Sequence, residues 1–337
     1  MNVIKKITKQ REFMIFIIIV VVFIIMSFAS PVFLTVGNQL ALIMSFSVTA
    51  IIAVGMTVLM VSGGFDMSVG SILGFTGIVA GWCLRQGIPV PVAVLIALIF
   101  GAAIGLFNGF TIAKIGINPF VTTLAGLSLF RGLTLIVSRG QSISPLPGSF
   151  NVIGQKMFLG IQTPIWYAVI IIIIGDILLR KSRFFRQYYY IGGNEKAARL
   201  SGIAVDRVKI IGYVMTGVLA AVAGVVMTAR LGTASVTAGS GLELQVVTAV
   251  IIGGASLQGG EGTVLGAFLG CLMMALINNV LTLLGVDVYW QTFVTGATLL
   301  TAVLIDTLNR KRKGQKGINA KAILSKDASP DAKNTQN

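Results

Sequence analysis

Long apolar segments follow one another along most of the chain, separated by short polar or glycine-rich connections. Ten such segments can be drawn, at residues 13–30, 39–61, 68–84, 90–112, 120–138, 162–179, 209–229, 243–258, 263–284 and 289–306. A helix needs about 20 apolar residues to cross the hydrocarbon core of a bilayer. The pattern therefore predicts an all-α, polytopic membrane protein with about ten transmembrane helices, some of them broken by glycine.

Composition indicates the same class of protein. Of the 337 residues, 55% are hydrophobic and 11% are charged, whereas a soluble domain carries charge on about a quarter of its residues. A chain this apolar is solvated mainly by lipid. Ten spans joined by short loops leave no room for a large soluble domain.

The positive charge is concentrated in three blocks. The chain has 26 basic and 11 acidic residues, a net charge of +15, and most of the basic residues lie at 1–11, 180–209 and 310–337. With ten spans and a cytoplasmic N-terminus, all three blocks fall on the cytoplasmic side, as the positive-inside rule requires. We therefore expect a multi-pass protein of the bacterial cell (inner) membrane with both termini in the cytoplasm. The charge is explained by topology and by contact with membrane lipid, without nucleic acid.

These patterns predict three regions. Residues 1–12 form a basic cytoplasmic N-terminus, and residues 13–308 form the transmembrane domain, with its longest cytoplasmic loop at about 180–209. Residues 309–337 are polar and lack hydrophobic periodicity, so we expect a disordered cytoplasmic tail. The longest external loop, at about 139–161, is either a contact for something outside the cell or a plain connector.

The chain lacks the usual residues of an active site. It has no histidine, and its two cysteines, Cys83 and Cys271, do not have the spacing of metal ligands. No GxxxxGK[ST] phosphate-binding loop occurs, so ATP chemistry would have to reside in another subunit. We expect no catalytic residue, no metal and no cofactor, and therefore a protein that is not an enzyme.

Two stretches interrupt the apolar segments with glycine and a carboxylate: GGFDMSVGS at 63–71 and SGLELQV at 240–246. A charged group inside the bilayer costs about 2.5–3.5 kcal/mol, so such residues normally face a protein interior, a partner or a water path. Asp66 and Glu243 are therefore candidates for a translocation pathway. Asp66 has a structural alternative, as a helix N-cap or as a buried partner of Arg131.

Internal repetition has two competing forms. The hexapeptides at 64–69 and 241–246 share the order glycine, apolar, acid, apolar, polar, valine, and their positions imply an inverted repeat. GSILG at 70–74 and GTVLG at 262–266 imply a parallel repeat instead. Glycines four apart, as in GAAIG at 101–105, predict close helix packing.

Asparagines at or near predicted helix ends either line a polar route or cap helices. They are Asn108, Asn118, Asn278 and Asn279.

The cytoplasmic loop contains a short predicted helix, NEKAARLSG at 194–202. Asn194 can cap it, Glu195 lies in the first turn where the helix dipole favours a carboxylate, and Gly202 can end it. Lipid solvation does not require such a helix. It is therefore either a docking surface for a cytoplasmic partner or a helix lying on the membrane surface.

Four segments in the same order resemble the permeases of ABC importers of the ribose-type sugar family, which includes ribose, xylose, galactose and autoinducer-2 importers. They are GGFDMSVGS at 63–71, with Phe65 and Met67 in place of two aliphatic residues, NGFTIAKIGINPFVTTLAGLSLFRG at 108–132, GGNEKAARLSGI at 192–203 and VIIGGASLQGGEGTVLGAFLG at 250–270. The resemblance covers about residues 40 to 308.

The resemblance implies a membrane-spanning subunit of an ATP-driven importer that moves a monosaccharide. An extracytoplasmic sugar-binding protein would deliver the sugar, separate or fused double ATP-binding subunits would dock on the 192–203 loop, and a second copy or a sister permease would complete the pathway. Its coupling role falls on Gly193, Asn194, Glu195, Ala197, Ala198, Ser201 and Gly202. Its mid-membrane signature falls on Gly64, Asp66, Ser68, Gly70 and Ser71.

Two alternatives stay open at this point. An ion-coupled secondary transporter would need an ion site at membrane depth, for which only Asp66, Glu243, Glu261 and Asp176 are available. Within the importer class, the substrate could instead be an autoinducer-2-like furanone, a nucleoside or a branched amino acid. The aspartate in GGFDMSVGS favours the sugar branch over the last two.

Overall fold

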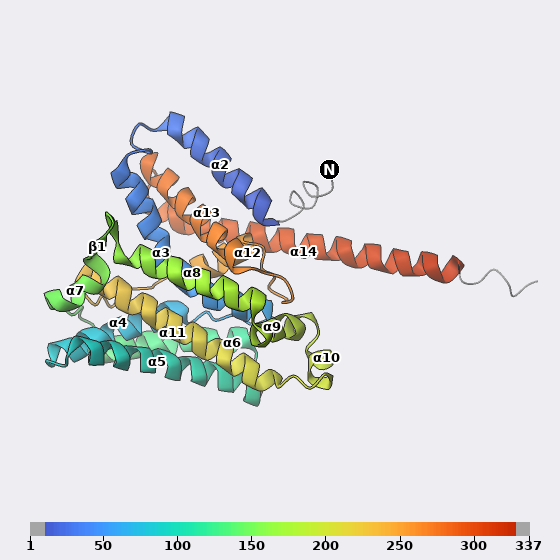
Figure 1. Ribbon diagram of the computed structural model, residues 1–337, viewed down its shortest axis with the longest axis horizontal. Coiled ribbons are helices and arrows are strands. Elements are labelled where there is room, and N and C mark those ends of the chain that lie inside the picture. The colour runs from blue at the N-terminus through green and yellow to red at the C-terminus, as the bar shows by residue number, and fades with distance from the viewer. Residues whose placement is uncertain (1–10, 328–337) are drawn as a thin grey trace, which may run out of the picture.

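Each of the ten predicted segments forms a helix in the computed structural model, which describes residues 11–327 (Figure 1). These helices are α2 (Arg11–Ala29), α3 (Val36–Val61), α4 (Val69–Arg85), α5 (Val90–Phe110), α6 (Pro119–Ser138), α8 (Thr163–Lys181), α11 (Val205–Leu231), α12 (Leu242–Ile252), α13 (Val264–Leu283) and α14 (Val288–Asp327). The predicted all-α membrane architecture is confirmed.

The ten helices are not equally long. Within residues 11–327, eight helices are long and apolar enough to cross a membrane, while α4 and α12 are shorter apolar helices. Helix α12 has only 11 residues because it starts after the loop at 232–241 and ends at Gly253. The two glycine-and-carboxylate breaks therefore shorten the spans that follow them.

Several short elements escaped the sequence analysis. A five-residue π-helix η1 (Thr111–Ile115) extends α5, and the external loop folds into α7 (Gly148–Gln155) and a hairpin of β1 (Met157–Phe158) and β2 (Ile161–Gln162). The cytoplasmic loop contains α9 (Arg183–Gly193) as well as the predicted helix, α10 (Glu195–Leu200). Their apolar runs are too short to stand out against the membrane spans.

Helices α3 and α11 form the centre of the bundle. Helix α11 packs against α3, α4 and α5, while α3 packs against α11, α12 and α13. Every residue from Ser47 to Val61 in α3 is buried, which explains why this helix is apolar on all sides. The exchange of partners relates α3–α4–α5 to α11–α12–α13. Gly212 lies against Leu59 and Thr216 against Gly55, so α3 and α11 run in opposite directions, which favours the inverted repeat over the parallel one.

Glycines bring α5 and α11 unusually close together. A Cβ atom on Gly101 would lie 2.6 Å from the carbonyl oxygen of Gly217 and 2.5 Å from Cβ of Ala221. Gly105 faces the backbone of Tyr213 in the same way. The close packing predicted for 101–105 is confirmed, since small residues let membrane helices approach backbone to backbone.

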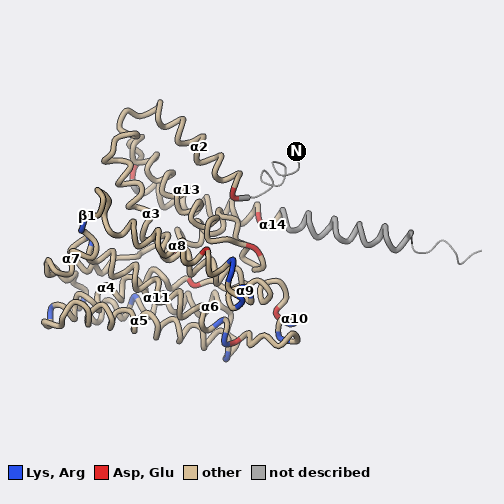
Figure 2. The backbone as a smooth tube through the Cα atoms, viewed as in Figure 1, with Lys and Arg blue, Asp and Glu red and all other residues tan. Residues whose placement is uncertain are grey.

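Helices α9 and α10 lie at the end of the bundle where α2 begins and from which α14 extends (Figure 1). Acidic and basic residues gather together near this α10 end (Figure 2). The start of α2 and the far part of α14 thus lie on the side of the 180–209 loop, as the expected topology requires. Helix α14 continues to Asp327, so the described part of the expected disordered tail is helical. Most of the basic N-terminus and residues 328–337 lie outside the described residues.

Replacing Gly101 with alanine should lower the thermal stability of the purified protein. The added methyl meets backbone atoms of α11, and overpacking of this kind costs about 1–3 kcal/mol. Gly132→Ala in α6 is the matched control, because a Cβ atom there meets nothing within 4 Å and alanine favours a helix by about 1 kcal/mol over glycine. Thermal unfolding in detergent measures both; equal midpoints for the two variants would contradict the packing argument.

Candidate functional site

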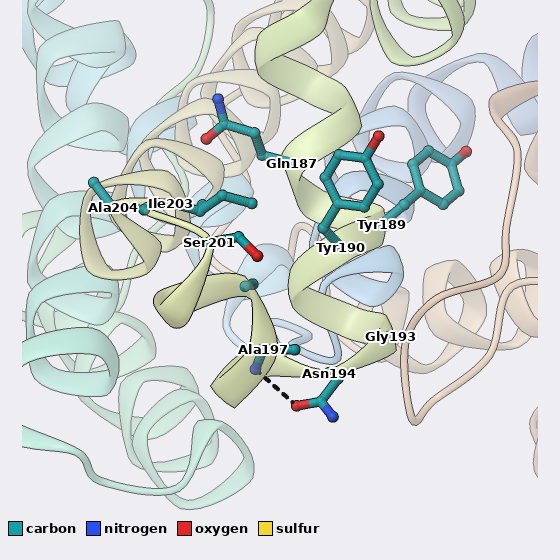
Figure 3. Close-up of a pocket in the computed structure, with 11 residues that line it drawn as sticks. Gln187, Tyr189, Tyr190, Gly193, Asn194, Ala197, Ser201, Ile203 and Ala204 are labelled. Atoms are coloured by element: carbon teal, nitrogen blue, oxygen red, sulfur yellow. Dashed lines mark hydrogen bonds between the residues drawn. The ribbon is translucent and has the colours of Figure 1, made fainter.

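A groove of about 800 Å³ separates α9 from α10 at the α10 end (Figure 3). Its lining residues come from both helices and the following turn: Gln187, Tyr189, Tyr190, Gly193, Asn194, Ala197, Ala198, Ser201, Gly202, Ile203 and Ala204. Six of the seven predicted coupling residues therefore line this groove, and Glu195 is the seventh, which does not.

Asn194 starts α10 as the sequence predicted. Its side-chain oxygen accepts a hydrogen bond from the backbone N–H of Ala197 at 3.0 Å (Figure 3), which satisfies one of the free donors of the first turn. Gly202 follows the helix with φ of +82°, a left-handed conformation that glycine adopts without strain. Both predicted ends of the short helix are confirmed.

A chain of ion pairs ties α10 to α11. Glu195 contacts Arg199 at 3.0 Å and Lys209 at 2.6 Å. Arg199 also contacts Asp206 at 2.6 Å, and Asp206 contacts Lys114 of η1 at 3.1 Å. Burial raises the pKa of the Glu195 carboxyl, but the hydrogen bonds and charges of Lys209 and Arg199 outweigh it and hold the pKa below its ordinary value.

Helix α9 is held against the membrane helices. The Tyr188 hydroxyl donates to the carbonyl of Val208 at 2.8 Å, and the Tyr189 hydroxyl donates to the carbonyl of Gly262 at 2.7 Å. Gly192 lies between the end of α3 at Val61 and the loop before α13. A Cβ atom on Gly192 would lie 2.5 Å from the backbone nitrogen of Gly260 in that loop. Helix α9 is therefore in direct contact with the end of α3 and with the loop between α12 and α13.

The predicted coupling residues differ in exposure. Gly193, Asn194 and Ala197 are exposed, whereas Ala198 is buried in the cluster that joins α9 to α3 and α11. Sequence reasoning missed Leu200, whose exposed fraction is 90%. The signal was a leucine inside a short polar helix that has no membrane span to pack against.

Asp66, Ser68 and Asn108 form one fully buried polar cluster between α3, α4 and α5. One Asp66 oxygen accepts from the backbone N–H of Ser68 at 2.8 Å and from its hydroxyl at 2.5 Å. The Asn108 side-chain nitrogen donates to the Ser68 hydroxyl at 2.9 Å and to Asp66 at 3.3 Å. Ser71 joins by donating to the carbonyl of Ser68 at 2.8 Å. The carboxylate is thus satisfied by neutral donors.

Both structural alternatives considered for Asp66 are wrong. Ser68, not Asp66, is the N-cap residue of α4. Arg131 makes no pair with Asp66; it donates to the carbonyls of Val236 and Ala238 at 3.0 and 2.9 Å. Arg131 thus satisfies two carbonyls of the loop before α12. The sequence could not predict this contact, because Arg131 and the loop lie about a hundred residues apart.

The remaining pathway candidates are divided. Gly70 lies against the Glu243 carboxylate and the backbone of Gly239, so the two breaks meet in space. Gly64 lies near the Tyr213 hydroxyl. Asn118 stands apart from this cluster, since its side chain caps α6 by accepting from the N–H of Phe120 at 2.8 Å.

The model of a known protein family matches residues 38–303, and its description is branched-chain amino acid transport system, permease component. The chain belongs to this family. The ribose import permease RbsC of Bacillus subtilis is 41% identical over 285 residues, covering 84% of this chain and 88% of the relative. RbsC of Escherichia coli K12 is 40% identical over 300 residues, covering 88% of this chain and 93% of the relative.

A third relative has a different cargo in its name. The autoinducer 2 import system permease LsrC of Klebsiella pneumoniae is 34% identical over 302 residues, covering 90% of this chain and 88% of the relative. No solved structure matches this chain. As a permease of this family with eight candidate spans among its described residues, the chain is a transport component of the bacterial inner membrane and not an enzyme.

The ion pairs of α10 should make its stability depend on pH. A carboxyl whose pKa is lowered by folding stabilises the fold fully above its ordinary pKa, and this stabilisation is lost as pH falls through the lowered value. Hydrogen exchange of the 194–203 segment, corrected for intrinsic rates, should therefore rise only under acidic conditions below the ordinary carboxyl range. Glu195→Gln should make that step smaller and leave the part due to Asp206, whose pKa Arg199 and Lys114 also lower; an unchanged step in this variant would mean that Glu195 does not contribute to it.

Proposed function

We propose that this permease is the membrane-spanning subunit of an ATP-driven importer that carries a monosaccharide into the bacterial cell. The observation that carries the proposal is α10, a short helix locked to the core by ion pairs while it presents an exposed leucine and a groove. The chain has no phosphate-binding loop of its own, so the energy has to arrive through a surface of this kind.

The partner at this surface is a cytoplasmic ATP-binding subunit. Its contacts are Gly193, Asn194, Ala197, Ser201 and Gly202 along the groove. Leu200 is the apolar anchor, since removing its exposed side chain from water is favourable. Ala198 and Glu195 hold α10 in place, Ala198 by packing in the buried cluster and Glu195 by ion pairing. ATP-bound and ATP-free partners supply the differential affinity that a conformational change requires.

The route of the motion follows from the contacts of α9. A pull on α10 moves Gly192, which is wedged between the end of α3 and Gly260. The backbone N–H of Gly260 in turn donates to the carbonyl of Val61 at 2.8 Å. Because α3 is buried from Ser47 to Val61, its displacement changes the packing of the whole bundle.

The other partners follow from the exposed surfaces. At the end opposite α10, the β1–β2 hairpin exposes Met157, Phe158 and Leu159, and we assign this tip to the extracytoplasmic sugar-binding protein. Helices α6 and α14 expose apolar faces toward their surroundings. Lipid or a second permease, either a copy or a sister chain, covers these faces.

A monosaccharide suits the chemistry of the membrane interior. Ribose permeases are 37–41% identical to this chain, against 34% for the autoinducer 2 permease and 32% for a xylose permease, which favours ribose over these two other cargoes. The Asp66 cluster and the contact of Gly70 with Glu243 belong, in this proposal, to the part of the pathway that rearranges when the breaks move. An ion-coupled mechanism is disfavoured because the Asp66 carboxylate is already bonded to Ser68 and Asn108.

ATP-dependent uptake of radiolabelled D-ribose into proteoliposomes tests the proposal. The vesicles contain the permease and sugar-importer ATP-binding subunits from the same bacterium, with the binding protein added outside. Uptake should require ATP inside the vesicles, where the cytoplasmic face of the permease lies, and the binding protein outside. Uptake that persists without the ATP-binding subunits and collapses with an ion gradient would identify a secondary transporter instead.

Leu200→Glu should uncouple the importer in the same vesicles. A carboxylate at the apolar anchor weakens docking, so sugar uptake and stimulated ATP hydrolysis should both fall by about tenfold, which corresponds to about 1.4 kcal/mol. Leu284→Glu, an equally drastic change at an exposed leucine beyond α13, should leave ATP hydrolysis within twofold. Normal coupling in Leu200→Glu would contradict the docking assignment.

A further inference from the structure

A polar cavity lies in the half of the protein away from α10. It has a volume of about 370 Å³ and is walled by α3, α12, α13 and α14. Each helix contributes an uncharged polar side chain: Thr49 from α3, Gln245 from α12, Asn278 from α13 and Gln291 from α14. No acidic or basic residue lines it. We call it the α13 cavity.

The α13 cavity runs from the end opposite α10 to about the middle of the bundle. Its lining on α13 extends from Thr282 down to Cys271, which lies 12 residues before the end of the helix at Leu283 and hence about 18 Å along its axis. Below Thr49, α3 is buried at every position to Val61. Packed protein therefore separates the cavity from the α10 end, as in the outward-open half of an alternating-access cycle.

Two neighbouring asparagines in this wall have different roles. The side chains of Asn279 and Asn38 bond reciprocally, at 2.8 and 3.3 Å, and so join α13 to α3. The side-chain oxygen of Asn278, by contrast, is buried without a hydrogen-bond partner. Interhelical bonding explains Asn279. It does not explain Asn278. This residue also lines the cavity, so a rotation of its side-chain amide turns the unpartnered acceptor, which is buried in this conformation, toward a donor inside the cavity.

A neighbouring cavity shows that this polarity is local. On another side of α3, a cavity of about 350 Å³ is walled by α2, α3, α8 and α13, and its lining is almost wholly apolar. The two cavities are similar in size and share Leu42 and Phe46. Only the α13 cavity combines several uncharged donors and acceptors with an unsatisfied one, which is the pattern of a site for a polar, uncharged molecule.

We propose that the α13 cavity receives an uncharged, polyhydroxylated substrate, and that the Asn278 side-chain oxygen accepts a hydrogen bond from one of its hydroxyl groups. The inference rests on the proposed function and deepens it. The volume falls within the range of about 300–1,000 Å³ that small-molecule sites occupy. Phe46 and Met274 supply apolar surface for the C–H face of the molecule, and the absence of charge excludes an ionic ligand.

The test compares D-ribose uptake by the complete importer in proteoliposomes. Asn278→Leu keeps a side chain of similar size but removes the acceptor, and Ala275→Leu fills the same cavity. Both should lower uptake at least tenfold, while ATP hydrolysis stimulated by the binding protein stays within twofold of the parent. Ala168→Leu fills the apolar cavity of similar size and should leave uptake within twofold.

The outcomes separate the two proposals. If the parent takes up none of D-ribose, D-xylose and L-arabinose although the complex hydrolyses ATP, the proposed function fails and this inference fails with it. If the parent takes up D-ribose and Asn278→Leu does so equally well at equal membrane amounts, only the cavity assignment is overturned.

A second measurement covers the case in which the leucine variants do not fold. Asn278→Cys is introduced with Cys83→Ala and Cys271→Ala, so that it is the sole thiol of the chain. A membrane-impermeant methanethiosulfonate added outside should block its D-ribose uptake and leave the cysteine-free parent unaffected. Uptake that resists the reagent would overturn the cavity assignment.

Discussion

The close contact of α3, α5 and α11 determines how the rest of the bundle is arranged. Gly55 of α3 faces Thr216 of α11, and a Cβ atom on Gly55 would lie 2.9 Å from the Cα atom of Thr216. Gly101 of α5 faces Gly217, the next residue of α11. Lipid removes most of the hydrophobic incentive for helices to associate, so van der Waals contact between such surfaces has to hold them. Helix α11 can approach two neighbours this closely because its own surface carries glycine, alanine and threonine.

Around this centre, the two broken segments meet. The break after α3 places Asp66 where Ser68 and Asn108 satisfy it, and the loop before α12 is held by Arg131 through two carbonyls. Gly70 brings these two regions into contact at Glu243. Irregular backbone at membrane depth is tolerated only where protein or a polar cavity surrounds it, and here side chains from distant spans complete its hydrogen bonds.

The same construction connects the two ends of the permease. At the α10 end, ion pairs and tyrosine hydrogen bonds fix α9 and α10 to α11 and to the glycine-rich loop before α13. At the other end, the α13 cavity is bounded by α3, α12, α13 and α14. Helix α3 contacts both regions, since it ends at Val61 beside Gly260 and its first half lines the cavity. The proposed coupling between α10 and the cavity therefore has a direct route through α3.

The hydrophobic pattern determined the class of the protein and the ten helical segments, and the capping residues predicted the short helix at 194–202, observed as Glu195–Leu200. These features depend on local periodicity and on residues close to each other in the chain. The pattern also located the glycine packing at 101–105. Tertiary structure decided which polar residues meet. Asp66 finds Asn108 rather than Arg131, Ala198 turns out to be buried while Leu200 is exposed, and Asn278 rather than Asn279 lacks a partner. Each of these outcomes depends on a contact between segments distant in sequence, and a linear pattern contains no information about which faces such segments present to one another.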